Sequence, residues 1–151
     1  VIDEPAAKLL ESRVEKAVAS GARVLAGGNR DGALLEPTII ADVARDAEMV
    51  VQESFGPLAP IMPVKDLDDA MELANGTAFG LSSGVVTRNM DSAIGAVKRI
   101  RTGTVNINAV PDYRIESSPF GGVKDSGLGI KEGVIASIEY MTNVKTFSLP
   151  W

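Results

Sequence analysis

The chain has 151 residues, of which 45% are hydrophobic and 23% charged, and its formal net charge is −5. These values are typical of a soluble globular protein, and the length fits a single domain with one sizeable core. Acidic and basic residues are mixed along the chain, which argues against a nucleic-acid-binding surface and against a polybasic membrane anchor. No apolar run approaches the about 18 residues of a membrane span, and no signal-peptide pattern opens the sequence.

The sequence contains no cysteine and no histidine. It therefore lacks the residues for a Ser-His-Asp triad, a Cys-His pair or a zinc site with the usual ligands. The absence of cysteine also fits a reducing compartment such as the cytoplasm. The chain begins at Val1 instead of Met, so we expect it to be either processed or part of a longer polypeptide.

Residues 3–21 predict a helix that Asp3 caps, that tolerates Pro5 in its first turn and that Gly21 ends. Its expected apolar face consists of Ala7, Leu10, Val14, Ala17 and Val18. Residues 23–40 then contain two short apolar runs separated by a glycine-rich segment at 27–32. This pattern predicts a hairpin or surface turn. A phosphate-binding loop is the alternative, but no helix and no Lys-Ser/Thr ending follow these glycines.

Strands and helices are expected to alternate after residue 58. Strands are predicted at 58–64, 82–87 and 103–108, with helices between them that start at Asp66 and Asp91. This order predicts parallel strands joined by right-handed crossovers, and hence an α/β fold. Ligands of such sheets lie beyond the carboxyl ends of the strands, so the loop after residue 108 is a candidate site.

The last third of the sequence has a different character. A loop rich in glycine and proline covers residues 109–129, and a short helix follows that carries Val134, Ile135 and Ile138. Residues 140–151 form an alternating, extended run. Because a terminal strand without a partner nearby in sequence often pairs with another chain or domain, we expect this run to mediate association.

Taken in order, several short motifs resemble the aldehyde dehydrogenase superfamily. Besides the opening helix they are 25-LAGG-28, 37-PTII-40, 52-QESFGP-57, 75-NGTAFGLSSGVVT-87, 103-GTVNIN-108, 119-PFGGVKDSGLG-129 and 145-KT-146. They match the part of the family that lies after its catalytic cysteine. The resemblance implies an α/β fold that forms the parallel-sheet half of the catalytic domain, at residues 1–138, and an oligomerisation tail at residues 139–151.

The resemblance also implies a cofactor contact. In the family the glutamate of the E-x-F-G-P motif accepts hydrogen bonds from the ribose next to nicotinamide, and the phenylalanine packs near the nicotinamide ring. Carried over, these residues are Glu53 and Phe55. A carboxylate can accept two hydroxyl donors, and an adjacent ring restricts the pose of the cofactor. The alternative is a solvated Glu53 beside a core Phe55. The implied cofactor is NAD or NADP. The sequence does not choose between them, because in the family the adenosine-ribose site that distinguishes NAD from NADP lies outside the matched part.

Three residues are implied to bind substrate. Asn108 ends a strand near the family's substrate channel, and Phe120 matches an aromatic wall of that channel. The alternatives are a strand-end cap and a plain core ring. Arg114 lies in the loop 109–120, where its guanidinium would suit an anionic aldehyde. The alternative for Arg114 is a surface ion pair with Asp112 or Glu116.

The loop 109–120 and the ending 143–151 look most like phosphonoacetaldehyde dehydrogenase, with the lactaldehyde and succinate-semialdehyde enzymes as near relatives. The expected reaction is oxidation of a small anionic aldehyde to its acid by a cytoplasmic homo-oligomer, a dimer or tetramer built through the C-terminal strand.

The chain also departs from the family pattern. It lacks the cysteine nucleophile and the motifs of the oxyanion-binding asparagine and general base, and Ala6 stands where a ribose-facing Gln is frequent. We therefore expect the chain alone to be inactive. Glu132 and Lys124 are expected to be solvated charges. The rival hypothesis is a stand-alone truncated module that associates with a full-length subunit.

Overall fold

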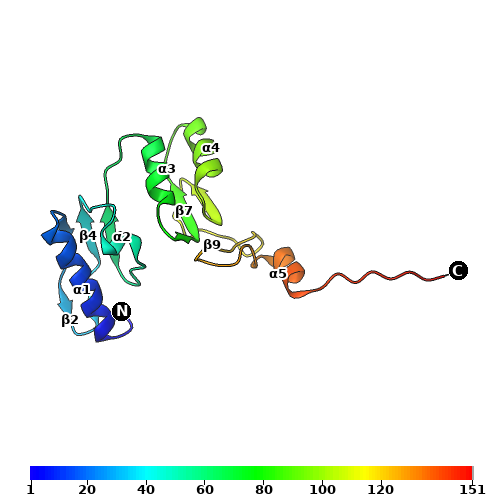
Figure 1. Ribbon diagram of the computed structural model, residues 1–151, viewed down its shortest axis with the longest axis horizontal. Helices are drawn as coiled ribbons and strands as arrows, with labels where there is room; N and C mark the ends of the chain where they lie inside the picture. The colour runs from blue at the N-terminus through cyan, green and yellow to red at the C-terminus, as the bar shows by residue number, and fades with distance from the viewer. Residues whose placement is uncertain (151) are drawn as a thin grey trace. The chain divides into compact units, whose positions relative to one another are not determined.

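The computed structural model describes residues 1–150, which divide into two compact units, Val1–Leu73 and Ala74 onward (Figure 1). The length alone suggested one domain around one core. Each of the four small sheets lies within one unit. None of the helices in the described residues is long and apolar enough to cross a membrane.

The first unit opens with α1 (Glu4–Ala19), and the predicted ends of this helix are confirmed. The Asp3 carboxylate accepts from the Ala6 backbone N–H at 2.8 Å, and Gly21 has a φ of 104° just beyond the helix. The expected apolar face is buried except for Val18, which is 45% exposed. Val18 was placed wrongly because it lies at the edge of the apolar stripe, next to the end of the helix.

The sheet of the first unit has the strand order β1-β4-β5, formed by Arg23–Ala26, Thr38–Ala41 and Leu58–Ile61. β1 and β4 are antiparallel, which confirms the hairpin; a smaller antiparallel pair, β2 (Arg30–Asp31) and β3 (Leu34–Leu35), lies between them in sequence. β4 and β5 are parallel, with Thr38 opposite Leu58. The short helix α2 (Glu48–Val51) lies on the connection between these two strands.

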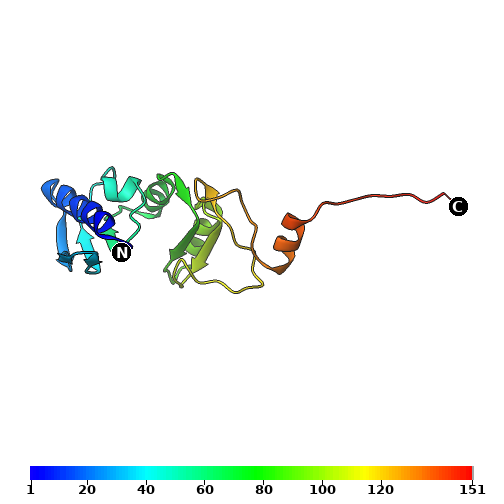
Figure 2. The same cartoon turned by 90° about the horizontal axis from the view of Figure 1, so that it is seen from below.

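The core of the first unit forms where α1 and α2 pack on this sheet (Figures 1 and 2). Ile40, at the middle of β4, is fully buried. It belongs to a cluster made of Val14, Ala17, Ala22, Ile40, Val43 and Met49. Burial of such side chains is the main stabilising contribution to a unit of this size.

The helix α3 (Leu67–Asn75) carries the chain from the first unit into the second. The Asp66 carboxylate accepts from the Asp69 N–H at 2.9 Å, which confirms the predicted cap. The next helix, α4 (Met90–Arg99), is capped by Asn89, whose side-chain oxygen accepts from the Ser92 N–H at 2.8 Å. Asp91 was therefore the wrong cap: it lies in the first turn of α4, where a negative charge still favours the helix dipole.

The second unit contains β7 (Ser82–Val85) and β8 (Thr104–Ile107), which α4 connects and which pair in parallel. This pair confirms the α/β prediction. The expected three-stranded parallel layer is divided, however, because β5 pairs with β4 in the first unit. Hydrophobic alternation predicts a strand but does not specify its neighbour. A second pair, β6 (Phe79–Gly80) and β9 (Val123–Lys124), is antiparallel.

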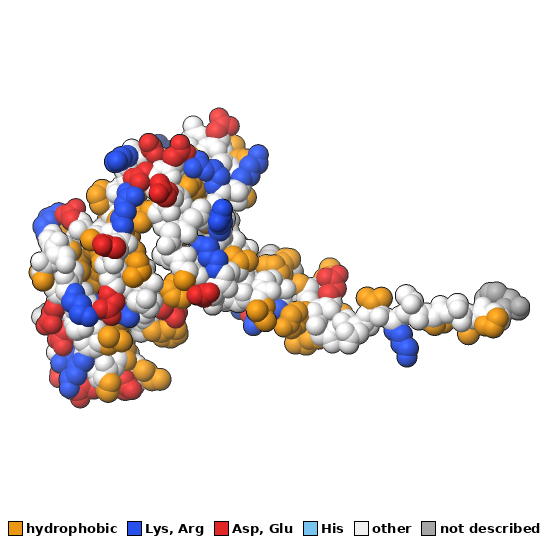
Figure 3. Space-filling model, viewed as in Figure 1, with side chains coloured by type: hydrophobic (Ala, Val, Ile, Leu, Met, Phe, Trp, Pro, Cys, Tyr) orange, Lys and Arg blue, Asp and Glu red, His pale blue; other side chains and the backbone are white. Residues whose placement is uncertain are grey.

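The chain ends with α5 (Val134–Met141) and an extended segment, residues 142–150, without helix or strand (Figure 2). None of the α5 side chains is buried, and Ile135 is 73% exposed. Figure 3 shows apolar side chains gathered on the surface around α5 and recurring along the extended segment. The pairing partner expected for the terminal strand stays a prediction, and Trp151 lies outside the described residues.

Candidate functional site

The loop 52–57 joins α2 to β5 in the first unit and carries Glu53 and Phe55. Two short backbone hydrogen bonds turn it: the Gly56 N–H donates to the Ser54 carbonyl at 2.7 Å, and the Leu58 N–H donates to the Gly56 carbonyl at 2.8 Å. A Cβ at position 56 would lie 2.2 Å from the Leu10 Cδ1 atom. Glycine at position 56 therefore allows the loop to pack closely against α1.

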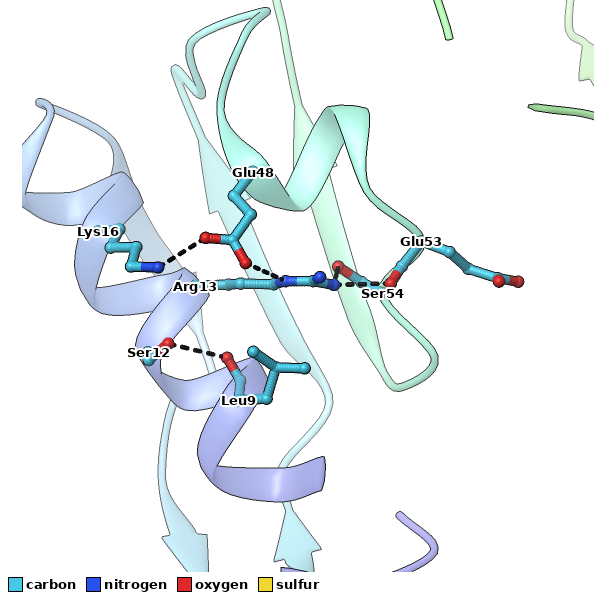
Figure 4. A network of polar contacts seen from close by, with 7 residues as sticks. All are labelled: Leu9, Ser12, Arg13, Lys16, Glu48, Glu53 and Ser54. Carbon is cyan, nitrogen blue, oxygen red and sulfur yellow. Dashed lines mark hydrogen bonds and ion pairs between the residues drawn. The ribbon is translucent and has the colours of Figure 1, made fainter. Parts of the chain in front are cut away.

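Arg13 of α1 connects the helix to this loop (Figure 4). Its side chain is 8% exposed, and its Nη1 group donates to the Glu53 carbonyl oxygen at 2.6 Å and to the Ser54 Oγ at 3.1 Å. Its Nε group donates to Glu48 Oε1 at 3.1 Å, and Lys16 donates to the other oxygen of that carboxylate at 2.6 Å. The buried guanidinium therefore has a counterion, a backbone carbonyl and a hydroxyl as partners.

The carboxylate of Glu48 is held in its charged form by these neighbours. The hydrogen bond from Lys16, followed by the one from Arg13, lowers the pKa of Glu48 below its ordinary value of 4.5. The Arg13 side chain thus retains its counterion at neutral pH.

Sequence reasoning did not identify Arg13. Leu10, Arg13, Val14 and Ala17 follow the spacing of one helix face. A charged residue within this buried stripe was the available signal, since a buried arginine requires partners.

Glu53 and Phe55 are both presented outward by the loop. The Glu53 side chain points away from Arg13, which contacts only its backbone oxygen (Figure 4). The Phe55 ring is 85% exposed, so the alternative of a core phenylalanine does not describe its position. An exposed carboxylate and ring on one tight loop have the chemistry to accept hydroxyl donors and to contact a flat ring. Their cofactor role stays a prediction.

The structure places Arg114 and Phe120 together in a pocket of the second unit. The Arg114 guanidinium carbon lies 4.7 Å from the centre of the Phe120 ring, and its Nη1 group donates to the Glu132 carboxylate. The pocket has a volume of about 330 Å³. It is lined by Arg114, Ile115, Glu116, Ser118, Phe120, Glu132, Gly133, Val134 and Ser137.

A backbone bridge brings these distant segments together. The Phe120 N–H donates to the Glu132 carbonyl at 3.1 Å, and the Glu132 N–H donates to the Phe120 carbonyl at 2.9 Å. The surface ion pair considered for Arg114 involved Asp112 or Glu116, but Arg114 pairs with Glu132, 18 residues further along the chain. Glu132 is therefore more than a solvated charge, and it lies in the pocket wall.

The other expected solvated charge, Lys124, also has partners: its ammonium group donates to the carbonyl oxygens of Asn75 at 3.0 Å and Thr77 at 3.1 Å.

Asn108 lies at the ends of β7 and β8 and is not among the lining residues of this pocket. Its backbone N–H donates to the Val85 carbonyl at 2.7 Å, and its side-chain oxygen accepts from the Thr87 N–H at 2.9 Å. Its φ of 55° is a conformation that asparagine tolerates better than most residues. These contacts are those of the strand-end cap, and a substrate contact by Asn108 stays a prediction.

The backbone after Phe120 is held by close packing between glycines. A Cβ at Gly103, just before β8, would lie 1.7 Å from the carbonyl oxygen of Gly121. Glycine at position 103 thus lets the segment that carries Phe120 lie directly against the start of β8. Among residues 1–150, no group of three or more acidic, cysteine or histidine side chains is placed to bind a metal ion.

The first unit thus presents a carboxylate and a ring on one loop, and the second unit holds a cation beside a ring in a small pocket. Residues 1–147 match the aldehyde dehydrogenase family, and the chain belongs to this family. The motifs from which the resemblance was inferred are therefore confirmed as family features.

Similar proteins include several small-aldehyde dehydrogenases. A lactaldehyde dehydrogenase from Methanococcus maripaludis is 36% identical over 146 residues, which are 97% of this chain and 31% of that protein. A sulfoacetaldehyde dehydrogenase from Neptuniibacter caesariensis is also 36% identical, with 97% of this chain and 32% of that protein covered. The chain thus spans about a third of the length of these relatives.

Solved structures agree with this assignment. Glyceraldehyde-3-phosphate dehydrogenase from Methanocaldococcus jannaschii, complexed with NADP, superposes with a TM-score of 0.89 and 38% identity, covering 96% of this chain and 31% of that one. Aldehyde dehydrogenase 21 from Physcomitrella patens, in complex with the reaction product succinate, has a TM-score of 0.87 and 40% identity, covering 93% and 29%.

Proposed function

We propose that these residues are the C-terminal portion of an NAD(P)-dependent aldehyde dehydrogenase that oxidises a small anionic aldehyde to its carboxylic acid. The family match over residues 1–147 supports the class of reaction. The share of about 31% of a relative's length supports the view that further segments complete the enzyme. The observation that carries the substrate class is the Arg114 guanidinium held beside Phe120 in a pocket.

Glu53 and Phe55 would hold the ribose and the nicotinamide ring of the cofactor, NAD or NADP, which takes up the hydride of the aldehyde. The outward carboxylate and the exposed ring fit this role, and two similar enzymes are solved with NADP. The nucleophilic cysteine is not among the 151 residues. We therefore expect the chain alone to orient the cofactor without catalysing oxidation.

Arg114 would bind the anionic end of the aldehyde. A guanidinium can donate two parallel hydrogen bonds to a carboxylate, phosphonate or sulfonate. Glu132 holds the Arg114 guanidinium beside the Phe120 ring, and Phe120 offers an apolar wall to the carbon chain. Relatives named for sulfoacetaldehyde and 3-sulfolactaldehyde, and a similar enzyme that binds succinate, have anionic substrates or products.

The substrate proposal is tested by Arg114→Ala in the complete enzyme. Since a hydrogen bond to a charged group contributes about 1.5–3 kcal/mol, KM for anionic aldehydes should rise about 10- to 150-fold. KM for a neutral aldehyde of similar size should change less than about 3-fold. Arg88→Ala is the matched control, because Arg88 is an exposed arginine of the same unit outside the pocket. Equal effects on both aldehydes would remove the anionic-substrate proposal.

We also propose that the enzyme is a homo-oligomer, a dimer or tetramer, assembled in the cytoplasm through its C-terminal segment. The support is the exposure of large apolar side chains at Val144, Phe147 and Leu149, where an alternating strand could pair with a second copy. Removal of residues 142–151 should shift the complete enzyme to smaller species in analytical ultracentrifugation. An unchanged sedimentation profile would contradict this role.

A second candidate function is a stand-alone module that associates with a full-length subunit. The exposed apolar face of α5 and the extended segment favour it, because both present association surface without a nucleophile. The two functions are separated by reading the coding frame upstream of Val1. A continuous frame of about 300 residues with a cysteine in it supports the dehydrogenase, and a start codon just before Val1 supports the module.

A further inference from the structure

The loop that carries Glu53 and Phe55 is connected to α1 through one buried side chain. Arg13 donates to the backbone oxygen of Glu53 and to the hydroxyl of Ser54. We propose that Arg13 is a positioning residue for the cofactor: it fixes the backbone at 53–54 so that the Glu53 carboxylate and the Phe55 ring face outward. This inference rests on the proposed cofactor role of Glu53.

The choice of atoms supports a positioning role. Arg13 binds the carbonyl of Glu53 at 2.6 Å, and the side chain of Glu53 points the other way (Figure 4). The guanidinium therefore orients the residue while leaving its carboxylate on the outer side. A contact between the two side chains would have paired the carboxylate with Arg13 and removed it as an acceptor for the ribose.

The counterion arrangement explains why the positioning group can be buried. An isolated buried guanidinium is strongly unfavourable, and Glu48 of α2 compensates the charge at 3.1 Å. Lys16 binds the second oxygen of Glu48 from the adjacent turn of α1. Because α2 leads directly into the loop 52–57, Arg13 ties α2 and the first half of this loop to one helix. A rigid planar donor suits this task better than a flexible ammonium.

The test compares Arg13→Gln with Lys16→Gln in the complete enzyme. Both variants remove a cation from Glu48, but Lys16 is 63% exposed and donates to Glu48 without contacting the loop 52–57, so it serves as the matched control. Hydrogen exchange of the Gly56 and Leu58 amides reports the order of the loop. Fluorescence titration with NADPH and with NADH reports cofactor binding without turnover.

We expect Arg13→Gln to accelerate exchange at these amides about 10-fold or more and to raise the Kd of the reduced cofactor by about 10-fold, since the loop then loses its charge-assisted hydrogen bond to α1. Arg13→Lys should restore part of the affinity, and Lys16→Gln should change either quantity by less than about 3-fold. If Arg13→Gln does not fold, Ser54→Ala removes one acceptor from the loop side and should give a smaller change in the same direction.

The inference is overturned if Arg13→Gln leaves the exchange at residues 56 and 58 or the Kd unchanged while Glu53→Gln weakens binding; the proposed cofactor site would then stand without Arg13. If Glu53→Gln itself leaves the Kd unchanged, the cofactor assignment fails and the positioning role fails with it. The two failures are thus distinguished by the Glu53 variant.

Discussion

Arg13 in the first unit is 8% exposed, whereas Arg114 in the second unit is 50% exposed. Arg13 binds a carboxylate, a backbone carbonyl and a hydroxyl. Arg114 has one carboxylate and one ring beside it in a pocket. The first arrangement commits an arginine to holding a loop, and the second keeps one side of an arginine accessible to a ligand.

The same contrast extends to the surroundings of the two residues. Arg13 lies beside a packed cluster in which Ile40 has no exposed surface. Arg114 lies near α5, in which no side chain is buried. A loop near a packed core can be held rigidly, whereas a pocket beside an uncovered helix depends on what packs against that helix in the complete protein.

The largest expected effect is on the free energy of unfolding, and it compares the packed cluster around Ile40 with the exposed helix α5. Ile40→Ala should lower the free energy of unfolding by about 2–5 kcal/mol, because it leaves a cavity at a fully buried position. Ile135→Ala should change it by less than about 0.5 kcal/mol, because Ile135 is largely exposed. Urea unfolding of the 151-residue chain measures both, and similar losses would contradict the contrast.

The next prediction compares the two arginines directly. Arg13→Met should cost about 2 kcal/mol, because it removes the donor to the Glu53 backbone carbonyl and to one oxygen of the Glu48 carboxylate. Arg114→Met should cost less than about 1 kcal/mol, since its ion pair is half exposed. Thermal unfolding followed by circular dichroism would show this difference, and a greater loss from Arg114→Met would reverse the assignment of roles.

Helix caps offer a comparison in which the two units should behave alike. Asp3→Ala and Asn89→Ala should each destabilise the chain by about 1 kcal/mol, because each removes one acceptor for an N-terminal helix amide. Chemical denaturation of both variants measures the effect. A negligible loss at one cap would show that packing of that helix outweighs its local start signal.

The smallest expected effect concerns acid. Hydrogen bonds from Arg45 and from the Lys65 N–H hold the pKa of Asp69 well below its ordinary 3.8, and Lys16 and Arg13 lower that of Glu48. A depressed carboxyl pKa stabilises the folded state above the unfolded value and loses this contribution as the pH falls through the folded value. The melting temperature should therefore fall from about pH 5 to about pH 2, and less steeply in Asp69→Asn and Glu48→Gln. If the melting temperatures of the unsubstituted chain and of both variants fell equally with pH, this prediction would be contradicted.

Local signals in the sequence predicted the elements well where one residue decides the outcome. Asp3 and Gly21 bound α1, and Asp66 starts α3, as expected. The start of α4 was missed because Asn89 and Asp91 are both suitable caps, and only the extended backbone at Asn89 (φ −96°, ψ 120°) selects between them. The positions of capping residues in the sequence therefore locate the start of a helix to within a few residues.

The candidate sites could be predicted only in part. Glu53, Phe55, Arg114 and Phe120 were identified from motifs, and the structure brings Arg114 and Phe120 together. Arg13 and Glu132 were not identified, because their partners lie about 40 and 18 residues away in the chain. Contacts of this range are set by packing, and for Arg13 the local signal was limited to a charged residue within the buried stripe of α1.

By itself, the sequence determined the family and the α/β class, because motifs and side-chain periodicity are local properties. Only the tertiary structure decided that β5 pairs with β4, that Arg13 binds the Glu53 carbonyl and that Glu132 pairs with Arg114. Strand partners and buried charges are chosen by the free energy of the whole packed arrangement, in which each backbone group and each charge must find a partner.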